Sequence, residues 1–256
     1  MIRDATGPAE ARHLSYETLG STNAEALALA RAGEHGPVWI TAKTQSAGRG
    51  RRGNTWSSPP GNLYATLLLT EPAPPARAPQ LSFVAALAVH DAITERTPGL
   101  TDRLALKWPN DVLVGGKKVA GLLIEAENAP VFSVAIGVGI NCVSHPDGTP
   151  FPATDLAVER ATVSADTLFA ALSRTMAARL AQWQAGADFP AIRRDWLVRA
   201  AGIGEMLQVR LPDRELTGRF MGLDDHGRLL VQPESGPHLK ITAGEVFGFG
   251  APKGAA

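Results

Sequence analysis

The chain has 256 residues, of which 45% are hydrophobic, and its 25 Lys and Arg residues balance 25 Asp and Glu. This balance and a pI near 7.0 argue against a bulk nucleic-acid binder, which normally carries a basic excess. No apolar run approaches the roughly 20 residues of a membrane helix, and the first residues lack a hydrophobic segment of signal-peptide length. We therefore expect a cytosolic protein, and the single cysteine, Cys142, suits a reducing compartment.

The first third of the chain predicts a helix and two strands around a long loop. Thr22 precedes Glu25 by three residues, which is the spacing of a capping box, so a short helix is expected to start at Thr22 with that hydroxyl as its cap. Residues 37–42 and 62–70 are short apolar runs bounded by Gly and Pro, as strands are. Residues 43–61 lie between them, and we call this segment the arginine loop. It is rich in Gly, Ser and Pro, and loops of this length are usually functional or disordered.

The remainder predicts a mixed sheet followed by a smaller β unit. Residues 80–95 have the spacing of a core helix, and the apolar runs 103–108, 118–127 and 131–140 are expected to be central strands of one sheet. Helical spacing returns at 168–183 and 192–196, and these helices should cover a sheet face. From residue 202, five short β runs joined by turns indicate a small antiparallel barrel. The predicted fold is α+β (mixed α/β), with a central mixed sheet flanked by helices in domain 1–201 and the barrel in domain 202–256.

The arginine loop contains Gly48-Arg49-Gly50-Arg51-Arg52-Gly53. Glycines let the backbone approach a ligand closely, and guanidinium groups suit carboxylates or phosphates, so such a loop can wrap a small polyanion. A solvated basic turn or a nucleic-acid contact is the alternative. The segment has neither the P-loop spacing nor a GxGxxG between a strand and a helix.

A second candidate segment is KWPND at residues 107–111. Lys107 ends an apolar strand, where a lysine is costly to bury unless a negative group meets it. Alternatively, Lys107 is an edge residue whose ammonium reaches solvent through the turn. The Pro-Asn-Asp sequence predicts a tight turn beside it.

Considered together, the glycine and arginine segment, KWPND, KVAGLLIE at 118–125 and IGVGIN at 136–141 resemble the biotin protein ligase family. The resemblance runs from residue 21 to residue 246, and the first two motifs at this separation are highly specific. It implies an enzyme that joins the carboxylate of biotin to the α-phosphate of ATP and releases pyrophosphate. The biotinyl group of biotinoyl-5′-AMP then passes to a lysine of a biotin carboxyl carrier protein, such as the acetyl-CoA carboxylase subunit. It also implies that the C-terminal barrel is SH3-like.

The resemblance further implies roles for individual residues. Arg51 and Lys107 are the expected catalytic cations, which stabilise the phosphoryl oxygens and the carboxylate–phosphate junction respectively. The expected biotin contacts are Ser21, Thr22, Asn23, Gln45, Arg49, Gly50, Arg51, Lys107, Gly121, Gly137 and Gly139. The expected adenylate contacts are Arg51, Arg52, Trp56, Asn110 and Asn141. No residue is expected to be a dedicated metal ligand, because Mg²⁺ would arrive with ATP, and Asn110 and Asp111 either orient their turn or help to place it.

Several expectations concern the whole protein. Some family members carry an N-terminal helix-turn-helix that represses transcription, but only 20 residues precede Ser21, so we expect a monofunctional ligase that does not bind DNA. The arginine loop is expected to be mobile without ligand and ordered over biotinoyl-5′-AMP. Two alternatives stay open: a lipoate or octanoate ligase or transferase of the same superfamily, and a non-catalytic binding module. The sequence does not distinguish a monomer from a homodimer.

Overall fold

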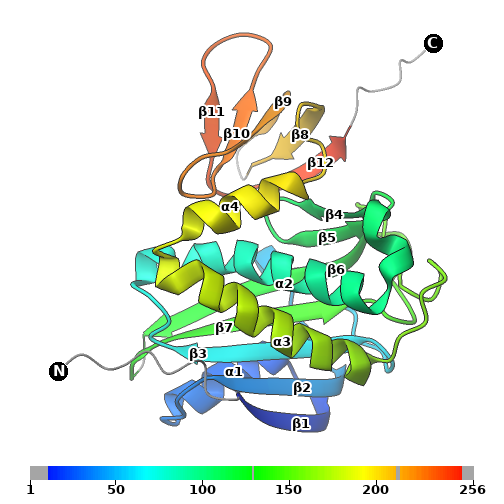
Figure 1. Ribbon diagram of the computed structural model, residues 1–256, viewed down its shortest axis with the longest axis vertical. Coiled ribbons are helices and arrows are strands. Elements are labelled where there is room, and N and C mark those ends of the chain that lie inside the picture. Colours follow the sequence, from blue (N-terminus) through cyan, green and yellow to red (C-terminus); the bar gives the residue numbers. More distant parts are fainter. Residues whose placement is uncertain (1–10, 129, 212–213, 250–256) are drawn as a thin grey trace.

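Two β-sheets organise the chain, which the computed structural model describes over residues 11–128, 130–211 and 214–249 (Figure 1). The larger sheet has the order β1-β2-β3-β7-β6-β5-β4, and the smaller one has the order β11-β10-β9-β8-β12. In the larger sheet β1 and β2 pair in parallel and the other neighbours are antiparallel. The predicted α+β class with a mixed sheet is therefore confirmed.

The elements have the following bounds. The larger sheet contains β1 (Arg12–Leu19), β2 (Val38–Gln45), β3 (Leu63–Thr70), β4 (Leu104–Lys107), β5 (Asp111–Val114), β6 (Lys117–Asn128) and β7 (Phe132–Ile140). The smaller sheet contains β8 (Met206–Arg210), β9 (Glu215–Leu223), β10 (Leu229–Gln232), β11 (Leu239–Ile241) and β12 (Glu245–Phe249). The α-helices are α1 (Thr22–Arg31), α2 (Leu81–Arg96), α3 (Ala165–Trp183) and α4 (Phe189–Val198). Within the described ranges, no helix combines the length and the apolar character needed to cross a bilayer.

Helices cover both faces of the larger sheet because its strands carry apolar side chains that point to both faces. Val38 and Ile40 of β2 pack with helix α1, whereas Trp39 between them belongs to the core beneath α2 and α3. Successive side chains of a strand point to opposite faces, so one buried strand can serve two helical layers. Helix α2 is buried on most sides because it lies between the sheet and helices α3 and α4 (Figure 1).

Three strand predictions need correction. The run 103–108 was expected to be central, but β4 is the edge strand of the larger sheet. Strand β1 was not predicted, because it is a largely exposed edge strand in which polar residues dominate. Strand β5 was also missed, although Gly115 and Gly116, both with positive φ, form the two-residue hairpin that joins it to β6.

Helix α1 begins at Thr22 as predicted, but its cap is a different residue. Ser21 has extended backbone angles and its side chain accepts a hydrogen bond from the backbone N–H of Ala24. The Thr22 hydroxyl instead donates to Gln45 Oε1 at 3.1 Å, and its oxygen lies 2.8 Å from the Thr66 hydroxyl oxygen. The capping-box prediction was therefore wrong by one residue, which leaves Thr22 free to join the sheet to the helix.

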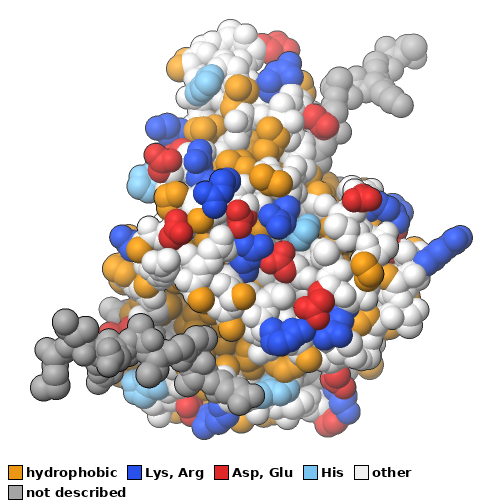
Figure 2. Space-filling model, viewed as in Figure 1, with side chains coloured by type: hydrophobic (Ala, Val, Ile, Leu, Met, Phe, Trp, Pro, Cys, Tyr) orange, Lys and Arg blue, Asp and Glu red, His pale blue; other side chains and the backbone are white. Residues whose placement is uncertain are grey.

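The five C-terminal β runs all form strands, and the sheet that they make packs against the larger one. Among the described residues no ladder joins β11 to β12, so the SH3-like barrel stays a prediction. Trp108 Nε1 donates to the carbonyl of Gly227 at 3.1 Å, and the Phe83 ring lies against Gly227. Buried residues of both sheets form one continuous core. On the face shown in Figure 2, basic and acidic side chains are interspersed over α3 and α4, in keeping with the zero net charge.

Candidate active site

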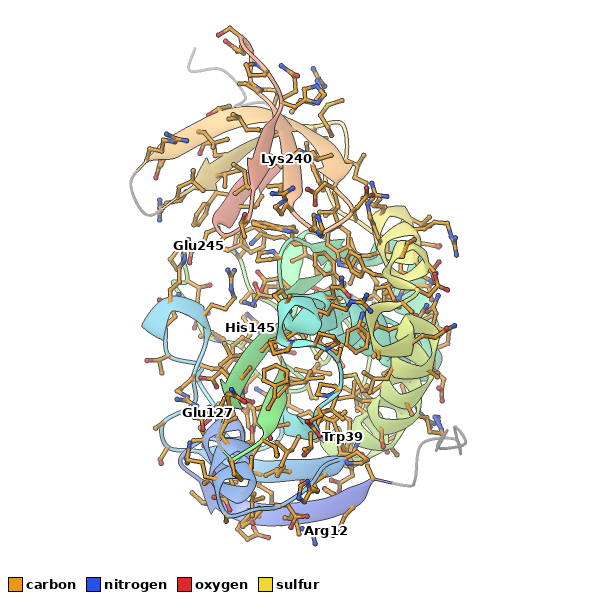
Figure 3. All side chains as sticks on the ribbon, turned by 90° about the vertical axis from the view of Figure 1, so that its left-hand side faces the viewer. Arg12, Trp39, Glu127, His145, Lys240 and Glu245 are labelled. Carbon is orange, nitrogen blue, oxygen red and sulfur yellow. The ribbon has the colours of Figure 1, made fainter. Side chains whose placement is uncertain are left out.

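A cavity of about 530 Å³ opens between the arginine loop, the adjoining strands of the larger sheet and the start of β12. Figure 3 shows Glu245 at the end of the C-terminal sheet that faces this region. The structure brings together at the cavity all the predicted site residues except Arg52. Arg52 is exposed and has a positive φ of 56°, and its adenylate role stays a prediction.

Two lysines meet one buried carboxylate in the wall of the cavity. Lys107 Nζ lies 3.2 Å from Asp111 Oδ2, and Lys118 Nζ lies 2.6 Å from Asp111 Oδ1. Burial lowers the pKa of Lys107, and Asp111 partly offsets this effect. Burial also disfavours the charge on Asp111, but the two ammonium groups outweigh it and hold the pKa of Asp111 below its ordinary value. The cluster therefore presents a net positive charge to the cavity.

The turn between β4 and β5 fixes this arrangement. Lys107 pairs with Asp111 across the antiparallel ladder, and the Asn110 side chain donates to the carbonyl of Leu122 at 2.7 Å. Lys107 is only 6% exposed, and its ammonium lies 3.6 Å from the centre of the Phe151 ring. The alternative of a solvent-reaching edge lysine was therefore wrong. In this structure Asn110 and Asp111 orient the turn.

Lys118 is a charged residue of the cavity that the sequence did not predict. It follows the Gly115-Gly116 hairpin, where Lys117-Lys118 has the character of a solvated turn. The β5–β6 register shifts between Val112 and Leu113, and such irregularities redirect side chains near functional sites. The hairpin glycines and the nearby Asp111 were the available signals. The shift itself cannot be read from the sequence.

Arg51 connects the arginine loop to the β4–β5 turn and to the residue before β12. Its Nη1 donates to Asn110 Oδ1 at 3.3 Å and to the carbonyl of Gly244 at 3.4 Å. Burial, followed by the neighbouring Arg52, lowers the pKa of Arg51, while Asp111 and Glu245 act in the opposite direction. The guanidinium keeps further N–H groups for an anion in the cavity.

The Asn23 amide is held by three protein groups. Its two N–H groups donate to the carbonyl of Leu123 at 3.2 Å and to Glu125 Oε2 at 2.9 Å, and its oxygen accepts from Thr66 at 2.7 Å. An amide has only two donors, so Asn23 has none left for a ligand here. In this structure Asn23 connects helix α1 to strands β3 and β6, and its biotin contact stays a prediction.

Gln45, the last residue of β2, connects helix α1 to Ser58 of the arginine loop. Its Oε1 accepts from the Thr22 backbone and hydroxyl, and its Nε2 donates to Ser58 Oγ at 2.9 Å. The Ser58 hydroxyl then donates to the carbonyl of Trp56 at 3.0 Å. These bonds between described residues leave one N–H of Gln45 and the O–H of Ser21 as the donors that this corner offers to a ligand.

Side chains from other segments approach the backbone closely at three strand glycines, Gly121, Gly137 and Gly139. A Cβ atom on Gly121 or Gly139 would lie 2.8 or 2.5 Å from the Trp56 indole, and one on Gly137 would lie 2.3 Å from the Asn23 amide. Biotin was expected to lie against these glycines. A ligand ring on Gly121 and Gly139 and the Trp56 indole exclude each other, so binding there requires the indole to move.

The segment after β7 closes another side of the cavity. The Asn141 side chain donates to the carbonyl of Thr154 at 3.0 Å, and His145 Nδ1 lies 2.6 Å from Asp155 Oδ2.

Burial raises the pKa of the Cys142 thiol to about 11, so this cysteine is not a nucleophile near neutral pH.

Comparison with known proteins defines the class and then the family. Residues 18–141 match the biotin/lipoate A/B protein ligase family, and residues 202–247 match the biotin protein ligase C terminal domain. The chain is 43% identical to the biotin–[acetyl-CoA-carboxylase] ligase of Paracoccus denitrificans, over 89% of this chain and 96% of the relative. Identity to the Mycobacterium tuberculosis ligase of the same description is 35%, over 89% and 85%.

A solved structure agrees with these sequence relatives. The biotin protein ligase from Aquifex aeolicus in complex with biotin and ATP superposes with a TM-score of 0.79 at 25% identity, covering 92% of this chain and 97% of that one. The chain belongs to the biotin protein ligase family, and the resemblance drawn from its motifs is confirmed.

Proposed function

We propose that this chain activates biotin with ATP and transfers the biotinyl group to a lysine of a biotin carboxyl carrier protein. A carboxylate oxygen of biotin attacks the α-phosphorus of ATP, pyrophosphate leaves, and biotinoyl-5′-AMP forms. The lysine amine then attacks the acyl carbon, AMP leaves and an amide forms. The observation that carries the proposal is the cavity with cations Arg51, Lys107 and Lys118 in its walls, in a chain 43% identical to such a ligase.

The cations address the main barrier to the first step. Biotin and ATP are both anions, so their approach is opposed by charge repulsion until fixed positive groups offset it. Lys107 is proposed to meet the carboxylate–phosphate junction, and Arg51 the phosphoryl oxygens. Asp111 keeps Lys107 and Lys118 side by side, at 3.2 and 2.6 Å from its oxygens. No protein nucleophile takes part.

Magnesium is part of the proposal as a companion of ATP, since Mg²⁺ with a nucleotide takes phosphate oxygens and water as most of its ligands. Asp111 does not suit it, because both carboxylate oxygens face lysine ammonium groups. In the part of the chain that the structure describes, no three His, Cys, Asp or Glu side chains gather as a metal site.

We further propose a catalytic unit at 1–201, an SH3-like unit at 202–256 and a cytosolic location, the last supported by the lone cysteine.

Biotin-dependent exchange of labelled pyrophosphate into ATP tests the first step. We expect exchange with biotin and none with lipoate or octanoate. A lipoate ligase would show the opposite preference, and a binding module would show no exchange with any acid. Transfer is then measured on a carrier domain, with a carrier whose acceptor lysine is replaced by arginine as the control.

The arginine loop provides a second test. Biotin and ATP together are expected to slow tryptic cleavage after Arg49, Arg51 and Arg52, because a loop that closes over the adenylate becomes less accessible to protease. Limited proteolysis followed by mass spectrometry identifies the cut sites, and ATP with lipoate is the control. Equal cleavage rates with and without biotin plus ATP would contradict the predicted ordering.

A further inference from the structure

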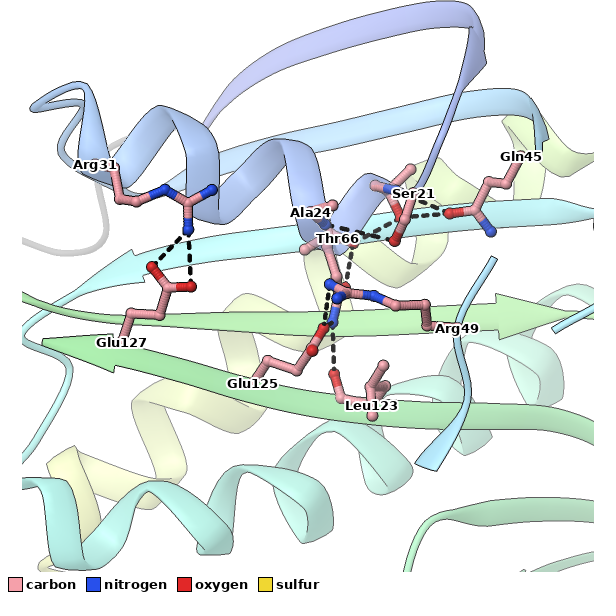
Figure 4. A network of polar contacts seen from close by, with 11 residues as sticks. Ser21, Ala24, Arg31, Gln45, Arg49, Thr66, Leu123, Glu125 and Glu127 are labelled. Atoms are coloured by element: carbon pink, nitrogen blue, oxygen red, sulfur yellow. Dashed lines mark hydrogen bonds and ion pairs between the residues drawn. The ribbon is translucent and has the colours of Figure 1, made fainter. Parts of the chain in front are cut away.

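Two carboxylates of β6 face helix α1 from the same side of the strand (Figure 4). Glu127 pairs with Arg31 at the last turn of α1, with a shortest distance of 2.7 Å. Glu125 binds two groups through one oxygen: Oε2 accepts from Asn23 Nδ2 at 2.9 Å and from Arg49 Nη2 at 3.0 Å. The two glutamates are two residues apart and make ion pairs of similar exposure, but only Glu125 contacts residues that line the cavity.

We propose that Glu125 is a positioning residue for biotin binding. This inference rests on the proposed function. Glu125 does not itself line the cavity, so it acts through Asn23 and Arg49, which do. Its carboxylate joins three separate segments at one point: the first turn of α1, strand β6 and the arginine loop.

The contact to Asn23 fixes the orientation of a buried amide. Asn23 is 3% exposed, and its oxygen is held by Thr66. The amide can therefore place its nitrogen toward β6 only while Leu123 and Glu125 both accept from it. Without the carboxylate, one buried N–H competes with Arg49 for a single neutral acceptor or goes unpaired, which is unfavourable.

The contact to Arg49 acts on the loop. The pair is partly exposed, at 44% for Arg49 and 27% for Glu125, so it adds little to the stability of the fold. It nevertheless holds the first arginine of the loop to the sheet. When this tether is lost, biotin binding must also supply the free energy of ordering the loop, so the KM for biotin rises while the chemical step is preserved.

The experiment compares Glu125→Gln with the matched control Glu127→Gln in biotin-dependent pyrophosphate exchange. For Glu125→Gln we expect the KM for biotin to rise about 10-fold, as for loss of one hydrogen bond to a charged group. The kcat and the KM for ATP should stay within about twofold of the parent, as expected when biotin binding is weakened equally in the ground state and the transition state. Glu127→Gln should change none of these constants.

A second readout follows the tether directly. Without ligands, trypsin should cut the arginine loop of Glu125→Gln faster than that of the parent or of Glu127→Gln, because Arg49 is no longer held. If Glu125 acts through Arg49, the Glu125→Gln/Arg49→Met double variant should have a biotin KM no higher than that of the weaker-binding single variant.

Four results would contradict the role of Glu125 or the proposed function on which it rests. A biotin KM unchanged by Glu125→Gln in an active enzyme overturns the inference, as does an equal rise in Glu127→Gln, which would indicate general packing of α1. A Glu125→Gln chain that fails to fold while Glu127→Gln folds also overturns it, because the role would then be structural. Absence of exchange in the parent chain contradicts the proposed function itself and removes the inference with it.

Discussion

Replacing Lys107 with methionine is expected to lower biotin-dependent pyrophosphate exchange by about 10²- to 10³-fold, the usual effect of removing one preorganised charge stabiliser. The ammonium is buried beside the cavity, where a charge acts with little screening. The fold should persist, because Lys118 still lies 2.6 Å from Asp111 and methionine occupies similar space under the Phe151 ring. Exchange rates and thermal unfolding measured together separate these two effects.

Lys117→Met is the matched control for Lys107→Met. Lys117 begins β6, next to Lys118, but is half exposed, and its Nζ lies 3.9 Å from Glu159, outside the cavity lining. Its replacement should leave exchange within about twofold of the parent, as surface substitutions usually do. A Lys107→Met enzyme with undiminished exchange would contradict the proposed catalytic role of Lys107.

Arg51→Met is expected to lower exchange by about 10²-fold and to weaken retention of the adenylate, because a planar donor fork toward the phosphoryl oxygens is lost. The change also breaks the contacts to Asn110 and Gly244, which hold the loop between the two sheets. Arg51→Lys, which keeps the charge without the fork, should recover only part of the rate. The readouts are exchange kinetics and the off-rate of bound biotinoyl-5′-AMP.

Arg194→Met serves as the control for Arg51→Met, since Arg194 is a largely exposed arginine on α4 and lies outside the cavity lining. If Arg51→Met and Arg194→Met have the same exchange rate and the same off-rate, the assignment of Arg51 to the phosphoryl oxygens is wrong.

Sequence patterns identified the elements that are rich in apolar residues or alternate regularly. The core helix at 80–95 is a nearly continuous apolar segment, the five C-terminal strands are short β runs between turns, and all of them are present. Strand β1 has no such signal, because an exposed edge strand needs few apolar residues. The position of β4 at the edge depends on which strands pair, and pairing between distant segments leaves no local pattern.

The site was predictable as a set of motifs but not as a set of contacts. The motifs bring together segments around Ser21, Arg51, Lys107 and Gly139, and the structure places all four at one cavity. Which of their donors are already used depends on register and rotamers. The exchanged roles of Ser21 and Thr22 show this, because two adjacent hydroxyls have the same sequence signal and only the backbone angles decide which one caps the helix.

The hydrogen bond from Trp108 to Gly227 has a consequence for thermodynamics. The indole belongs to the turn that carries Lys107, and its acceptor belongs to the C-terminal sheet. Since both sheets also share one core, separating them exposes apolar surface and removes the acceptor of the Trp108 indole N–H. We therefore expect the two sheets to melt in one cooperative transition, in which the turn that carries Lys107 unfolds together with the C-terminal strands.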